Sequence, residues 1–179
     1  MKISKGWKLV LLGVGLVIVD QVSKILVKEN MQLGDQIFVI GQWFRLCFVE
    51  NEGMAFGMAF GGNAGKFLLS LFRICLSGVL VWWISRLIKD PGTPFGVLVG
   101  LTLITAGAVG NIFDSLFYGI IWDYAPFMFG KVVDMLYFPI IRTDNFVFFS
   151  PVFNFADSCV TVGAFYLVLF HWRFFSDKK

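Results

Sequence analysis

The sequence predicts an all-α integral membrane protein: four transmembrane helices, with a small extracytoplasmic antiparallel β-sheet in the first outer loop. Of its 179 residues, 58% are hydrophobic and only 15% are charged, whereas soluble domains have about 45–50% apolar and about 25% charged residues. Too few polar side chains remain to cover a surface in water. The net charge of +3 is also too small for a nucleic-acid binder. We expect a single membrane domain over residues 1–179.

Four windows of the sequence are apolar enough to cross about 30 Å of hydrocarbon, which takes about 20 residues. They cover residues 9–27, 67–84, 95–113 and 153–172. Lysine and arginine gather at the two chain ends and between the second and third windows: Lys2, Lys5, Lys8, Arg86, Lys89, Arg173, Lys178 and Lys179. Because cytoplasmic segments carry an excess of these residues, we expect both termini in the cytoplasm and the two long loops outside.

The two long outer loops differ in pattern. The first, about residues 28–65, contains a run rich in Phe, Ile, Val and Trp at 37–49, and glycine-containing turn signals at 51–53 and 61–63. This pattern predicts a small antiparallel sheet lying on the outer membrane surface. The second loop, about residues 115–152, is aromatic and contains three prolines. We expect it to lie in the membrane interface.

Acidic residues gather toward the outer face of the predicted bundle. Asp20 lies in the outer half of the first span, Asp114 at the outer end of the third, and Asp157 in the first turns of the fourth. Asp134 lies in an apolar stretch of the second outer loop. Ionisable groups within a span are costly, which makes them candidates for function. Two carboxyl groups held close together share a proton, so one can activate a water while the other polarises a peptide carbonyl. This aspartic-protease chemistry needs no metal and no cofactor.

Each acid also has a structural interpretation. Asp20 precedes Lys24 by four residues, the spacing of an intrahelical ion pair. Asp114 could cap the third span, and Asp157 could be a favourable charge at a helix N-terminus. Arg73, in the second span, is expected to reach the interface or to pair with a buried acid.

A small proton-coupled membrane carrier using buried acids is the alternative function. A carrier needs polar residues across the whole membrane, whereas the acids here gather at one face. The three cysteines and the single histidine lack the spacing of a metal site, so we expect no metal.

Four motifs follow one another along the spans: Asp20-Gln-Val-Ser-Lys24, Asn51-Glu-Gly53-Met-Ala55-Phe56, Gly107-Ala-Val-Gly110-Asn111-Ile-Phe-Asp114 and Phe153-Asn154-Phe-Ala156-Asp157-Ser158. Together they resemble the lipoprotein signal peptidase family (signal peptidase II), and the resemblance covers nearly the whole chain. It implies an aspartic endopeptidase of the bacterial cytoplasmic (inner) membrane that removes the signal peptide from prolipoproteins, cutting before the cysteine that carries diacylglycerol. The implied partners are the diacylglyceryl-prolipoprotein and membrane lipid, with no nucleic acid and no metal.

The resemblance also implies roles for individual residues. It makes Asp134 and Asp157 the catalytic pair, near the outer (periplasmic) face. Asp20 and Lys24 match positions that are mainly structural. Other motif residues match positions that shape the site or hold substrate: Asn51, Gly53, Asn111, Asp114, Asn154 and Ala156.

The chain departs from the family pattern in two ways. Ser115 stands where the family usually has an arginine, so a site-organising cation is missing or is supplied by Arg45, Lys131 or Arg142. Asp134 also follows Asp114 at a longer spacing than is usual. Asp123 lies at the usual spacing, in a segment, Gly119-Ile-Ile-Trp-Asp123, that also resembles the motif. We prefer Asp134, because Gly130-Lys-Val-Val-Asp134 keeps the two valines of the motif, and we interpret residues 116–127 as an insertion.

Overall fold

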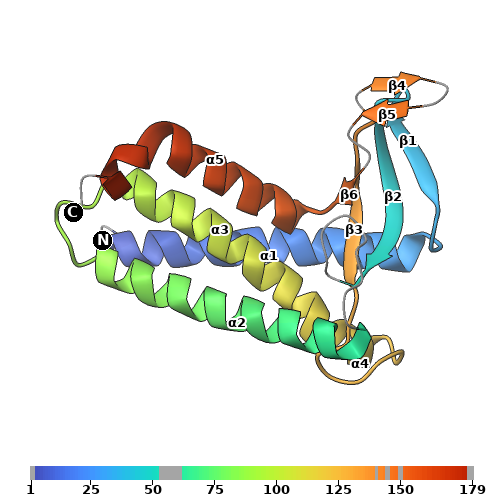
Figure 1. Ribbon diagram of the computed structural model, residues 1–179, viewed down its shortest axis with the longest axis horizontal. Coiled ribbons are helices and arrows are strands. Elements are labelled where there is room, and N and C mark those ends of the chain that lie inside the picture. The colour runs from blue at the N-terminus through green and yellow to red at the C-terminus, as the bar shows by residue number, and fades with distance from the viewer. Residues whose placement is uncertain (1–2, 53–61, 140, 144–145, 149–150, 177–179) are drawn as a thin grey trace.

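The computed structural model of the chain describes residues 3–52, 62–139, 141–143, 146–148 and 151–176. It contains four helices that are long and apolar enough to cross a membrane, which confirms that prediction. They are α1 (Lys5–Asn30), α2 (Gly62–Leu87), α3 (Phe95–Phe113) with its extension to Ile121, and α5 (Phe155–Ser176). The central helix is α3, which packs against α1, α2 and α5 (Figure 1).

Small residues allow α3 and α5 to approach closely. A Cβ atom on Gly107 would lie 2.2 Å from the carbonyl oxygen of Ala156, and one on Gly163 would lie 2.8 Å from the carbonyl oxygen of Gly100. Helices in membranes commonly associate through such small residues. Lipid is as apolar as the side chains, so the hydrophobic effect does not drive the helices together, and close backbone packing stabilises their association. The close approach brings the C-terminal end of α3 against the first turn of α5.

The third helix continues beyond the predicted end of its span. After Phe113 it passes through a π-helical turn, η2 (Asp114–Tyr118), into the short α4 (Gly119–Ile121), although the sequence analysis placed an outer loop from residue 115. The returning chain packs directly on this turn: a Cβ on Gly130 would lie 2.1 Å from the carbonyl oxygen of Asp114. Single π-turns within helices often occur at functional sites.

A four-stranded antiparallel sheet lies at one end of the bundle, in the order β1-β2-β3-β6. Its strands are β1 (Gln36–Ile40), β2 (Phe44–Asn51), β3 (Val132–Tyr137) and β6 (Val152–Phe153). A separate pair consists of β4 (Ile141–Thr143) and β5 (Phe146–Phe148). The sheet lies opposite the end where α1 begins and α5 ends (Figure 1).

The sheet predicted in the first outer loop is confirmed, and the second loop adds β3 and β6 to it, which were not predicted. Val49 of β2 is paired with Asp134 of β3, so Asn51, two residues further along β2, lies diagonally across from Asp134 on the same face. Pairing of Leu136 with Phe153 brings the start of α5 beside β3. The register of three strands therefore places residues from both loops at the C-terminal end of α3.

Candidate active site

Asp134 lies on β3 with only 2% of its surface exposed. Its Oδ2 accepts a hydrogen bond of 3.0 Å from Asn51 Nδ2, and its Oδ1 accepts one of 2.7 Å from Asn154 Nδ2. Burial raises the pKa of Asp134 to about 7, and the negative charge of Asp157 acts in the same direction, against the two amide donors. This carboxyl group can therefore gain and lose a proton near neutral pH.

Asp157 lies in the first turn of α5 and is half-buried. Its Oδ1 accepts a 2.7 Å hydrogen bond from Asn111 Nδ2. Its Oδ2 accepts from the backbone N–H of Asn154 at 3.3 Å, while its own backbone N–H donates to Asn154 Oδ1 at 2.8 Å. This reciprocal pair has the form of a capping box, in which the residue before the helix and the third helical residue satisfy each other. The Asn-Phe-Ala-Asp sequence thus orients the carboxylate of Asp157 through local structure, and Asn111 of α3 holds its other oxygen.

Asn154 joins the two carboxylates and is fully buried. Besides its bonds to Asp134 and Asp157, its Nδ2 donates to Asn111 Oδ1 at 3.0 Å. Both amide protons and the amide oxygen are therefore engaged, so the orientation of the side chain is determined by its partners. Asp134 and Asp157 consequently face the same small region between β3, α3 and α5.

Below this pair, Lys24 of α1 is buried among oxygen atoms. Its Nζ lies 2.8 Å from Asp20 Oδ2 and 2.8 Å from Asp114 Oδ2, and it donates to Asn111 Oδ1 at 2.9 Å. The expected pair of Asp20 with Lys24 is present, and it forms part of a larger network. Three oxygen acceptors match the three donors of an ammonium group.

The acids of this network hold backbone groups of neighbouring elements. Asp20 Oδ1 accepts from the backbone N–H of Ala156 at 2.9 Å, which ties α1 to α5. Asp114 Oδ2 accepts from the backbone N–H of Val133 at 3.3 Å, which ties η2 to β3 beside Asp134. Asp114 thus positions the strand that carries Asp134.

Two residues of the network, Gln21 and Tyr118, were not predicted from the sequence. Gln21 Nε2 donates to Asp114 Oδ1 at 2.9 Å, and Gln21 Oε1 accepts from the Tyr118 hydroxyl at 3.1 Å. The signal was present, because Gln21 is a polar residue within an apolar span. The structure also explains the glycine at position 110, because a Cβ atom there would lie 2.6 Å from Asp20 Oδ2.

The structure shows the surroundings of the residues at the two departures from the family pattern. Ser115 is buried and its hydroxyl donates to the carbonyl oxygen of Asn111 at 3.0 Å. Asp123 is exposed at the turn after α4, with a φ of 52°, while Asp134 is the acid placed beside Asn154. Gly53 and the side chain of Arg142 lie outside the described part of the chain.

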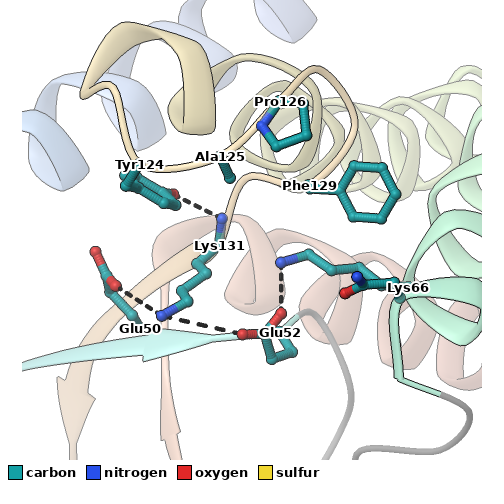
Figure 2. A pocket seen from close by; sticks show the side chains of 9 residues that line it. Glu50, Glu52, Lys66, Tyr124, Ala125, Pro126, Phe129 and Lys131 are labelled. Atoms are coloured by element: carbon teal, nitrogen blue, oxygen red, sulfur yellow. Dashed lines mark hydrogen bonds and ion pairs between the residues drawn. The ribbon is translucent and has the colours of Figure 1, made fainter.

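Of the other expected cations, Arg45 donates from Nη1 to Gln36 Oε1 at 3.1 Å. Lys131 Nζ lies 3.4 Å from Glu50 Oε2 and 4.0 Å from Glu52 Oε1. Lys66, at the start of α2, pairs with the other oxygen of Glu52. Figure 2 shows Lys66, Lys131 and the two glutamates around a cavity of about 520 Å³ between the end of β2, the start of α2 and the loop after α4.

Comparison with known proteins identifies the family. A family model described as signal peptidase (SPase) II matches residues 12–173. The chain belongs to the signal peptidase II family. A lipoprotein signal peptidase of Porphyromonas gingivalis is 40% identical over 198 residues, covering 96% of this chain and 86% of the relative. One of Amoebophilus asiaticus is 37% identical over 184 residues, covering 93% and 78%.

Solved structures agree with the signal peptidase II assignment. A bacterial membrane enzyme superposes with a TM-score of 0.71 at 28% identity, covering 96% of this chain and 92% of that structure. Family membership favours a peptidase over the carrier considered above. Within the described residues, no group of three or more His, Cys, Asp and Glu side chains is placed to hold a metal ion.

Proposed function

We propose that this signal peptidase II is an aspartic endopeptidase that removes the signal peptide from prolipoproteins, cutting before the diacylglyceryl-modified cysteine. The observation that carries the proposal is the position of the buried Asn154 between two carboxyl groups from different elements. Its side-chain amide donates to Asp134 of β3, and its backbone N–H donates to the carboxylate of Asp157 of α5. One of the two, Asp134, has a pKa raised to about 7 by burial. A pair that holds one proton near neutrality suits general acid–base catalysis of peptide hydrolysis.

In this mechanism the ionised carboxylate takes a proton from a water molecule, whose oxygen attacks the scissile carbonyl carbon. The protonated carboxyl donates a hydrogen bond to the carbonyl oxygen as negative charge develops there. The C–N bond then breaks, and the proton taken from water passes to the amine of the modified cysteine. Asn154 and Asn111 hold the two carboxyl groups in place throughout.

The proposed orientation places the site near the outer, periplasmic face of the cytoplasmic membrane. Lys5 and Lys8 lie where α1 begins, Arg86 and Lys89 at the end of α2 and just beyond it, and Arg173 near the end of α5. All belong to the end of the bundle opposite the sheet (Figure 1). The positive-inside rule makes that end cytoplasmic. The acyl chains of the substrate would then lie between the helices, within the membrane.

The test is cleavage of a diacylglyceryl-prolipoprotein in detergent by the wild type and by Asp123→Asn, Asp134→Asn and Asp157→Asn. We expect loss of at least about 10³-fold in kcat for the last two, typical for removal of a general acid or base with its transition-state contacts. The exposed Asp123 serves as the matched control and should keep its activity. If Asp123→Asn loses activity while Asp134→Asn keeps it, Asp123 is the catalytic residue. If the wild type does not cleave the substrate, the carrier function is favoured instead.

The same assay with a substrate that lacks diacylglycerol tests the lipid contribution. We expect much poorer cleavage of that substrate, because its acyl chains no longer contribute to binding between the helices. Equal cleavage of the two forms would contradict the proposed role of the lipid.

A further inference from the structure

The inward face of α2 carries a stripe of polar residues within a membrane-length helix. Lys66, Ser70, Arg73 and Ser77 recur at spacings of four, three and four residues, which places them on one side of the helix. Lys66, Ser70 and Ser77 are buried and Arg73 is half-buried, whereas Leu68 and Phe72 are each 62% exposed. The stripe therefore faces the bundle, and the apolar side chains face the membrane.

Lys66 fixes the position of this stripe relative to the proposed active site. It pairs with Glu52 (Figure 2). Glu52 directly follows Asn51, the residue whose amide donates to Asp134. Arg73 lies seven residues further along α2, or about 10 Å deeper in the bundle. There its charge acts on the carboxylates of Asp157, Asp114 and Asp134.

The charges around the site leave room for a second cation. Four carboxyl groups belong to the network, and Lys24 is the cation that contacts two of them directly. Even with one proton shared by the proposed catalytic pair, three negative charges face one lysine. A charged arginine within a span is itself costly unless opposite charges lie near it.

We infer that Arg73 is a positioning residue of the enzyme: its guanidinium supplies the second positive charge that sets the protonation of the Asp134–Asp157 pair. The inference rests on the proposed function of that pair. The elements packed around the pair carry these charged groups: Asp20 and Lys24 of α1, Glu50 of β2, the adjoining Glu52, Lys66 and Arg73 of α2, Asp114 of η2, and Lys131.

The pH profile of kcat/KM distinguishes this role from a merely structural one. Removal of a nearby positive charge makes both carboxyl groups of the pair hold their protons more tightly. In Arg73→Gln we therefore expect both limbs of the bell-shaped profile to move to higher pH by about one unit, which is about tenfold in rate on the acidic limb. Arg73→Lys keeps the charge and should keep the limbs near their wild-type positions.

Arg86→Gln, near the other end of the same helix, is the matched control and should leave the profile unchanged. If Arg73→Gln does not fold, the profile of Arg73→Ala with and without added guanidinium tests the same point, and guanidinium should move the limbs back toward lower pH. A uniform loss of activity with unmoved limbs overturns the inference. Activity retained by Asp134→Asn or Asp157→Asn would instead overturn the proposed function on which it rests.

Discussion

The buried ammonium of Lys24 predicts a large loss of stability when it is removed. In Lys24→Met the side chain keeps its approximate volume, but the carboxylates of Asp20 and Asp114 lose a cation that lies 2.8 Å from each. Both acids are essentially inaccessible to water. Removing one partner of a buried ion pair destabilises a protein by about 3–5 kcal/mol, because the remaining charge stays buried without compensation. We expect a loss in that range in the free energy of unfolding, measured in detergent.

Two further variants make that prediction specific. Lys8→Met changes an exposed lysine of the same helix and should alter stability by less than about 0.5 kcal/mol. Adding Asp114→Asn to Lys24→Met removes one of the stranded charges and should recover part of the loss. If Lys24→Met costs less than about 1 kcal/mol, or if the double variant is as unstable as the sum of the single ones, the network does not depend on this ion pair.

Three more predictions follow from the same contacts. The pKa of Asp134 is raised to about 7 by burial, so protonation of this carboxyl group stabilises the folded state. The contribution is complete below about pH 4 and is lost as the pH rises through 7, by about 4 kcal/mol at most. The free energy of unfolding, measured at pH 4.5 and pH 8, should show this dependence in the wild type and not in Asp134→Asn. Gly110→Ala should destabilise the protein by about 1–3 kcal/mol because its Cβ would lie 2.6 Å from Asp20 Oδ2, whereas Gly78→Ala, with nothing within 4 Å, should not; thermal unfolding compares the two. Asn154→Ala removes the helix cap of α5 and the amide that donates to Asp134, so kcat should fall by about 100-fold or more. A loss confined to KM would refute that role.

The parts of the site that the sequence predicts well are those built from local structure. The pair of Asp20 and Lys24 depends only on the four-residue spacing within one helix. The orientation of Asp157 depends on a capping box whose two members are three residues apart. Helix length and hydrophobicity likewise depend on a single continuous segment, so the number of membrane-length helices could be predicted without knowledge of their packing.

The environment of Asp134 could not be predicted in this way, because every contact it makes comes from another element. Its amide donors, Asn51 and Asn154, are 83 and 20 residues away in sequence. Their positions depend on the register of β2 against β3 and of β3 against β6, and the run containing β3 is too short to indicate a strand by itself. The π-turn after Phe113 has no clear sequence signal either.

Asp114 connects the local part of the site with the part that depends on tertiary contacts. It belongs to a local motif at the end of α3, yet its carboxylate accepts from the backbone N–H of Val133, the residue before Asp134. Lys24 contacts the same carboxylate, and Asn111, one helical turn earlier, donates to Asp157. The C-terminal end of α3 therefore holds the strand that carries one acid and the side chain of the other. Asp134 and Asp157 come from different segments of the chain, and the contacts of Asn111 and Asp114 tie both of them to this one helix end.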